Sequence, residues 1–171
     1  VINFTLKRIL VNMVYKKGEG WRTARTRKSL SAPMIVIQDY IQAQGHRNYV
    51  SLDYGCGRGT DADLLGMDKF DPNWIGPDIQ PIENRNTSEG YDIITNIYVL
   101  NVIREPEDRI KVLKEIQNLL SEHGVAFVAV RDDVPKNTES QFRVYLNLEL
   151  ISKVSGRFRI YRLTRNDELS V

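Results

Sequence analysis

A glycine-rich turn between two structured segments constrains this chain more than any other feature. Residues 50–65 read VSLDYGCGRGTDADLL, with three glycines at alternate positions and an aspartate two residues before the first. Glycine lets the backbone approach a ligand closely and adopt positive φ angles. A helix that begins after the turn points its N–H groups and positive dipole end at the same place. The stretch therefore predicts a β–α unit with a small ligand carrying negative charge at its turn.

Apolar periodicity predicts the remaining elements. We expect helices over 32–44, 60–66, 105–120 and 139–156, and strands over 48–55, 68–72, 91–100, 125–131 and 157–164. Ser31 is expected to cap the first helix, Thr60 or Asp61 the second, and Gly124 to end the third. Strands that alternate with helices indicate an α/β fold, mostly parallel, with helices on both faces of the sheet.

The stretch 73–90 is rich in Pro, Gly and Asn, so we expect a loop there with one stunted strand near Ile79. The fold should therefore be abbreviated at its third strand, and also at its C-terminal end. A length of 171 residues fits one domain, which we place at 21–171 after a basic extension over 1–20. No run reaches the roughly 18 apolar residues of a membrane span, and we expect a cytoplasmic protein.

Charge is distributed unevenly along the chain. Residues 1–50 contain nine Lys or Arg residues and only two acidic ones, although the whole chain carries +2. A basic arm favours contact with a polyanion, and the alternative is a solvated arm. The arginines and lysine that we expect to contact nucleic acid are Arg22, Arg25, Arg27, Lys28, Arg157 and Arg159. The single cysteine and the two histidines, which are far apart in the sequence, do not supply the cluster of ligands that a structural zinc site needs, so we expect no metal site.

The spacing of the glycines in the turn narrows the choice of ligand. Dinucleotide-binding loops have the spacing G-x-G-x-x-G, whereas this chain has D-Y-G-C-G-R-G over 53–59. That pattern resembles motif I of the class I methyltransferases that depend on S-adenosylmethionine (SAM), and it implies their Rossmann-like fold. The resemblance implies that Asp53 meets the amino-acid end of SAM and that Gly55, Cys56, Gly57 and Gly59 supply close backbone.

Further segments extend the resemblance. Asp71 follows the second strand and could accept both ribose hydroxyls, with Pro72 and Trp74 beside the adenine. Ser31, at the start of the first helix, could meet the SAM carboxylate. Asn96 would complete the cofactor site.

The catalytic candidates follow the strand over 91–100. Amino methyltransferases of adenine and cytosine carry a polar residue, two prolines and an aromatic residue here, and this chain reads Asn96-Ile97-Tyr98-Val99. The match is degenerate because both prolines are absent. We predict catalytic roles for Asn96, Tyr98 and Asn101; the alternative is that Asn96 ties off the strand end and Tyr98 packs in the core.

A narrower resemblance covers Trp21 to Arg131. The blocks WRTARTRKSLSAPM, LDYGCGRGTDADLL, DPNW and TNIYVLNVI, in this order, are similar to methyltransferases associated with DNA phosphorothioation and to small phage or mobile-element proteins. We therefore expect a SAM-dependent methyltransferase that acts on nucleic acid. The leading substrate is DNA, and the leading acceptor is an amino group of a base. The alternatives are a small-molecule or protein acceptor, or a non-catalytic binding module. Each of these interpretations is compatible with a protein partner or with a homo-oligomer.

Overall fold

The computed structural model describes residues 24–73, 79, 89–135 and 138–170, and in them a six-stranded sheet of order β2-β1-β3-β4-β6-β5. The strands are β1 (Ser51–Tyr54), β2 (Asp68–Phe70), β3 (Tyr91–Ile97), β4 (Leu120–Arg131), β5 (Glu149–Val154) and β6 (Phe158–Thr164). The helices are α2 (Ala32–Ala43), α3 (Thr60–Leu65), the 3-10 turn η3 (Leu100–Val102) and α4 (Pro106–Leu119).

The first four strands run parallel, and β6 joins β4 antiparallel with β5 on its outer side. The mostly parallel α/β sheet predicted from the sequence is therefore confirmed. Because β1 to β4 point the same way, the loops that follow them meet at one edge of the sheet. This edge is where open α/β sheets bind ligands.

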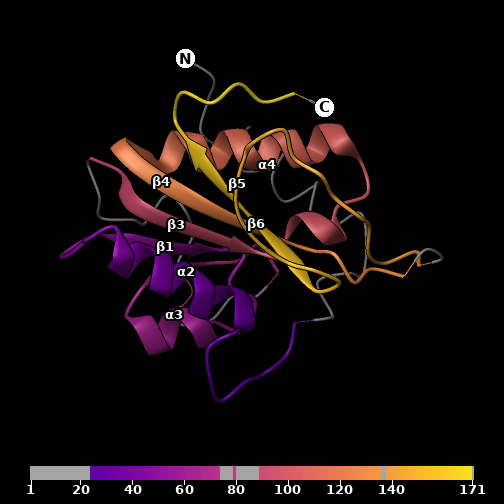
Figure 1. The fold of residues 1–171 in the computed structure, drawn as a ribbon, viewed down its shortest axis with the longest axis horizontal. Helices are drawn as coiled ribbons and strands as arrows, with labels where there is room; N and C mark the ends of the chain where they lie inside the picture. Colours follow the sequence, from indigo (N-terminus) through magenta and orange to yellow (C-terminus); the bar gives the residue numbers. More distant parts are fainter. Residues whose placement is uncertain (1–23, 74–78, 80–88, 136–137, 171) are drawn as a thin grey trace.

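Helices cover both faces of the sheet (Figure 1). On one face lies α4, which begins with a proline in its first turn and buries Val112, Leu113 and Ile116. On the other face α2 buries Ile37 and Ile41 in a second apolar cluster. Ser31 caps α2 as expected, since its Oγ accepts a hydrogen bond from the Met34 N–H at 3.4 Å.

The predicted helix over 139–156 is wrong. Residues 142–148 run without regular secondary structure, and β5 follows at Glu149–Val154. The apolar residues alternate here: Val144 is buried and Leu146 and Leu148 pack against the core, while Arg143, Tyr145 and Asn147 face solvent. This period of two is typical of extended chain, and it outweighs the helix propensity of the individual residues.

Gly124 does not end α4 as predicted. The helix stops at Leu119, and Gly124 lies five residues further on, inside β4. A Cβ atom on Gly124 would lie only 2.4 Å from the carbonyl oxygen of Tyr91. The glycine therefore permits a close approach of β3 and β4 where their register shifts.

Of the stunted strand expected near Ile79, the structure describes Ile79 alone, in a β-bridge; the neighbouring residues lie outside the described part of the chain. The basic extension over 1–20 also lies outside them. No helix in the described part of the chain is long and apolar enough to span a membrane.

Candidate functional site

The glycine turn joins β1 to α3 at the carboxyl edge of the sheet. Gly55 has a φ of 82°, and a Cβ atom on it would lie 2.3 Å from Cγ2 of Val99. The N–H groups of Gly55 and Cys56 both donate to the carbonyl oxygen of Phe70, at 2.7 and 3.0 Å. The turn is thereby fastened to the end of β2, and a side chain at position 55 would displace it.

Gly59, not Thr60 or Asp61, is the N-cap residue of α3, which is only one and a half turns long. Gly59 adopts a φ of 78°. Cys56 donates a weak hydrogen bond from its Sγ to the Gly57 carbonyl, 3.7 Å away. Burial raises the pKa of the Cys56 thiol, so the group stays protonated.

Asp53 is a buried carboxylate beside the turn. Its Oδ1 accepts a hydrogen bond of 2.9 Å from Oγ1 of Thr95. Burial raises the pKa of Asp53 to about 7, and the neighbouring carboxylates of Asp61 and Asp71 act in the same direction. A cationic group bound nearby would offset this cost of ionisation.

Asp71 follows β2 and faces the turn. Its Oδ2 accepts the Gly57 N–H at 2.8 Å, and its Oδ1 accepts the Asn73 N–H at 2.8 Å. It also lines the pocket described below. Pro72 follows it but is not among the lining residues, and Trp74 lies outside the described part of the chain.

Asp61 is a site residue that the sequence did not identify as such. Its carboxylate accepts the Ser31 N–H at 2.8 Å, the Ser31 hydroxyl at 2.7 Å and a guanidinium N–H of Arg27 at 2.9 Å. These bonds hold residues 24–31, which we call the N-terminal strap, against the start of α3. Ser31 is thereby engaged by Asp61 and does not line the pocket, whereas Ala24, Arg25 and Arg27 do. The sequence showed Asp61 only as a capping candidate because its partners are about 30 residues away.

Tyr98 also lines the pocket, directly after β3. It adopts a left-handed φ of 61°, and its N–H donates to the Ala129 carbonyl at 2.8 Å. This conformation is costly for a tyrosine and often marks a functional site. Burial raises the pKa of Tyr98 to about 12, so its hydroxyl remains a hydrogen-bond donor.

Asn96 and Asn101 are both buried, and neither is among the residues that line the pocket. Asn96 donates from Nδ2 to the Tyr54 carbonyl at 3.0 Å, while its Oδ1 has no hydrogen-bond partner among the described residues. Asn101 donates to the Phe142 carbonyl and accepts the Arg131 N–H, each at 2.7 Å. Both amides tie strand ends to neighbouring backbone, and their catalytic roles stay predictions.

Arg131 ends β4 and organises the segment that follows. Its Nε and Nη2 donate to the two carboxylate oxygens of Asp133, at 2.8 and 3.0 Å, and its Nη1 donates to Gln141 at 2.5 Å. The hydrogen bonds from Arg131 lower the pKa of Asp133. All three side chains line the pocket. The sequence placed Arg131 only as the last residue of a strand.

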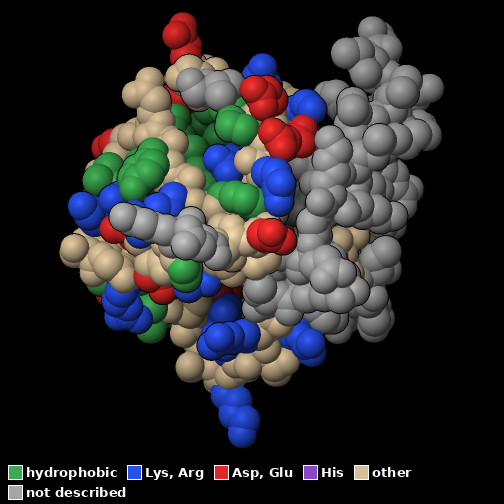
Figure 2. Space-filling model, turned by 90° about the vertical axis from the view of Figure 1, so that its right-hand side faces the viewer, with side chains coloured by type: hydrophobic (Ala, Val, Ile, Leu, Met, Phe, Trp, Pro, Cys, Tyr) green, Lys and Arg blue, Asp and Glu red, His purple; other side chains and the backbone are tan. Residues whose placement is uncertain are grey.

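These elements enclose a pocket of about 440 Å³ at the carboxyl edge of the sheet. Its lining carries both signs of charge. Beside the glycine turn lie Asp53, Asp61 and Asp71 together with Arg58 of the turn itself, and around the strap, the end of β4 and the start of β6 lie Arg25, Arg27, Arg131 and Arg157 together with Asp133. Two of these arginines pair with lining carboxylates, Arg27 with Asp61 and Arg131 with Asp133. Figure 2 shows the face at this edge, where Lys and Arg side chains gather with Asp and Glu among them.

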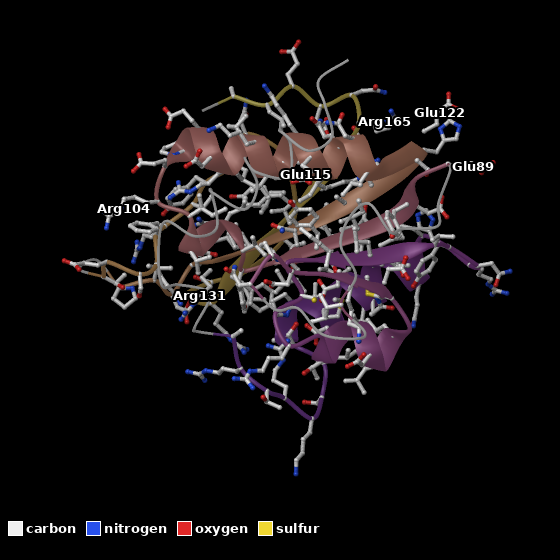
Figure 3. The ribbon with its side chains drawn as sticks, turned by 180° about the vertical axis from the view of Figure 1, so that it is seen from behind. Glu89, Arg104, Glu115, Glu122, Arg131 and Arg165 are labelled. Atoms are coloured by element: carbon white, nitrogen blue, oxygen red, sulfur yellow. The ribbon has the colours of Figure 1, made fainter. Side chains whose placement is uncertain are left out.

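The arginines in and beside β6 lie toward different ends of the molecule. Arg157 lines the pocket and Arg159 pairs with Asp132 at 2.9 Å. Figure 3 places Arg131 and Arg104 at one end and Arg165 at the other, so Arg165 is remote from the pocket. Among the residues that the structure describes, no group of three or more His, Cys, Asp or Glu could hold a metal ion.

Comparison with known proteins identifies the family. Residues 33–161 match the family model of a methyltransferase domain. This match covers most of the chain, and the chain belongs to that family. A search of curated proteins found no match.

Solved structures share the fold at low sequence identity. PH0226 from Pyrococcus horikoshii OT3 matches 74% of this chain and 86% of its own, with 16% identity and a TM-score of 0.51. A TehB-like SAM-dependent methyltransferase from Corynebacterium glutamicum matches 80% and 88%, with 18% identity and a TM-score of 0.50. A SAM-dependent methyltransferase from Clostridium acetobutylicum matches 57% of this chain, which spans only 49% of that protein, with 22% identity and a TM-score of 0.45. The chain thus contains a methyltransferase domain and shares the Rossmann-like fold of these structures, of which the Corynebacterium glutamicum protein is named as SAM-dependent.

The pocket fits SAM on physical grounds. SAM carries an ammonium and a sulfonium, and the carboxylates beside the glycine turn suit such cations. Within the described part of the chain, no ion pair is formed by the buried carboxylate of Asp53, whereas Arg27 pairs with Asp61 at 2.9 Å. Gly55 and Gly57 keep the turn free of side chains beside these carboxylates.

Proposed function

We propose that this chain transfers a methyl group from SAM to nucleic acid. The observation that carries the proposal is the charge of the pocket lining, in which Asp53 and Asp71 lie beside the glycine turn and Arg25 and Arg157 lie around the strap and the start of β6. A cationic cofactor is attracted to the carboxylates, and an anionic acceptor is attracted to these arginines. The resemblance to methyltransferases associated with DNA phosphorothioation supports DNA as the acceptor.

Asp53, Asp71 and the glycine turn would hold the cofactor. Asp53 would accept hydrogen bonds from its ammonium group, and Asp71 from its ribose hydroxyls. Bound SAM supplies an electrophilic methyl group on a sulfonium. The chain's own contribution is to place an acceptor nitrogen or oxygen in line with that methyl group and to exclude water.

Tyr98 and Asp133 would face the acceptor. Tyr98 can donate a hydrogen bond from its hydroxyl or stack on a base with its ring. Asp133, which Arg131 keeps ionised, can accept a hydrogen bond from an amino group and stabilise positive charge that develops on it. Arg25 and Arg157 would contact phosphate oxygens.

The proposal can be tested with methyl-labelled SAM and a mixture of unmodified DNA, RNA and cell extract. We expect label in nucleic acid, and digestion to nucleosides would identify the acceptor atom. Replacing Arg25 and Arg157 with Glu should weaken acceptor binding at least tenfold and leave SAM affinity unchanged. Arg47→Glu is the matched control, because Arg47 is exposed before the amino end of β1.

Label found in protein or in small molecules would overturn the acceptor class but retain the methyltransferase. Binding of SAM without transfer to any fraction would overturn catalysis by the chain alone, and would favour the non-catalytic module.

A further inference from the structure

An exposed tyrosine lies outside the pocket on the segment that was predicted to be helical. Tyr145 has 63% of its surface exposed, the largest fraction among the exposed large apolar side chains of the described residues. The guanidinium of Arg159 lies over its ring, with 4.5 Å from Cζ to the ring centroid. One face of the ring is therefore supported by a cation while the rest is open to solvent.

Two arginines surround this ring. Arg159 is held in place by Asp132, 2.9 Å away, and is only 14% exposed. Arg143 is exposed and donates from its Nε to the Val134 carbonyl at 3.1 Å. Hydrogen bonds from Arg159 and Arg143 lower the pKa of Tyr145. We call Arg143, Tyr145 and Arg159 the tyrosine platform.

The tyrosine platform is continuous with the pocket. Asp132, which pairs with Arg159, precedes the pocket residue Asp133, and its N–H donates to the Arg157 carbonyl at 2.9 Å. Arg157 itself lines the pocket. Four arginines (Arg131, Arg143, Arg157 and Arg159) against two aspartates (Asp132 and Asp133) leave this surface with net positive charge.

We propose that the tyrosine platform binds single-stranded nucleic acid, by stacking one base on Tyr145 and by contacting phosphates with Arg143. Single-stranded nucleic acid presents the faces of its bases, and proteins bind it with aromatic rings set in a basic groove. In a duplex these faces are stacked on each other and are not accessible to an exposed ring. The inference rests on the proposed function, which it extends by naming the acceptor as a single strand that runs from the pocket across the platform.

The structure also favours a preformed platform. Val144 is buried and Leu146 packs against the core on either side of Tyr145, so the backbone that carries the ring is anchored. The cation over one face fixes the orientation of the ring. Little conformational freedom would be lost when a base stacks on the open face.

The test is fluorescence anisotropy with labelled single strands of about 12 nucleotides, oligo-dT and oligo-rU, and with a DNA duplex of the same length. We expect tighter binding of single strands than of the duplex. Tyr145→Ala should weaken single-strand binding about tenfold, as is typical for the loss of one stacked base. Tyr145→Phe keeps the ring and should bind within about twofold of the wild-type chain. Arg143→Ala should weaken binding and reduce its dependence on salt.

Arg162→Ala is the matched control. Like Arg159, Arg162 lies on β6 and pairs with a carboxylate, that of Glu149 at 3.0 Å. Its partner is the residue directly opposite on β5, so this pair lies further along the β5–β6 ladder than Arg159. The Arg162→Ala variant should bind as the wild-type chain does. Calorimetry should show the same SAM affinity for all these variants.

Three outcomes would overturn the platform: tighter binding of duplex, unchanged binding by Tyr145→Ala, or equal weakening by Tyr145→Phe and Tyr145→Ala. In each of these cases nucleic acid could still be methylated, and the proposed function would stand. Failure of the wild-type chain to bind any of the three probes would overturn both the platform and the nucleic-acid acceptor, while SAM binding would be unaffected.

Discussion

At the scale of single residues, the proposed role of Asp53 in holding the cofactor makes a prediction about pH. Its pKa lies near 7 because the carboxylate is buried, so a substantial fraction is protonated below neutrality. In the proposed complex, the ammonium of SAM would favour the ionised form. We therefore predict that SAM affinity rises severalfold between pH 6 and pH 8, measured by calorimetry, and that Asp53→Asn abolishes this rise. A flat profile for the wild-type chain would contradict the role given to Asp53.

The raised pKa of Asp53 has the opposite consequence for the stability of the chain without cofactor, which should fall as pH rises. The folded pKa, about 7, lies above the ordinary value of 3.8, so the folded chain binds more protons than the unfolded chain between these values. Stability should therefore fall as pH rises from about 4 to 7 and then level off.

Asp53→Asn removes this buried charge but retains an acceptor for Thr95. We predict that it raises the melting temperature by roughly 5–10 °C at pH 8 and by less than half as much at pH 5. Thermal denaturation at the two pH values measures this difference. A lower melting temperature at pH 8 would show that Asp53 is stabilising when ionised.

At the scale of elements, the N-terminal strap depends on Asp61. Asp61→Ala would leave the Ser31 N–H, the Ser31 hydroxyl and Arg27 without their acceptor, at a cost of about 1–3 kcal/mol. We predict lower stability in urea and faster tryptic cleavage after Arg25 and Arg27.

Asp63→Ala provides the control on the same helix. Asp63 is 59% exposed and pairs with Lys69, so its loss should cost less than about 1 kcal/mol. Equal effects of Asp61→Ala and Asp63→Ala would contradict the claim that Asp61 holds the strap.

The segment 142–148 gives a second test at this scale. Val144 is 2% exposed and Tyr145 is 63% exposed, as expected of extended chain with alternating sides. We predict that Val144→Ala costs about 2 kcal/mol of unfolding free energy and Tyr145→Ala less than about 0.5 kcal/mol, measured by urea denaturation. Similar costs at both positions would contradict the alternation.

The elements also show where sequence analysis succeeded and failed. The β–α unit around Gly55, α2 with its Ser31 cap, and α4 were predictable, because their signals are local: capping residues, periodicity and turn glycines. The segment over 139–156 was not predictable. Its residues favour a helix by composition, and the period of two is confined to Val144, Leu146 and Leu148. Its extended form is set by packing on the core and by pairing with β6.

At the scale of the whole molecule, the sheet gathers residues from distant segments at one edge. The sequence correctly indicated Asp53, the glycine turn and Asp71 as neighbours, because each follows a parallel strand. It could not indicate the bonds of Asp61 to the strap or of Arg131 to Asp133 and Gln141, which depend on loop conformations without a sequence signature. Together these contacts hold the loops that carry the charged lining of the pocket, on which the proposed function depends.

The most direct test of this account is calorimetric titration of the purified chain with SAM. We predict binding at one site, weakened at least tenfold by Asp71→Ala in a protein that remains folded by circular dichroism. Absence of SAM binding by the wild-type chain, or equal affinity of Asp71→Ala, would contradict the assignment of the glycine-turn pocket as the cofactor site.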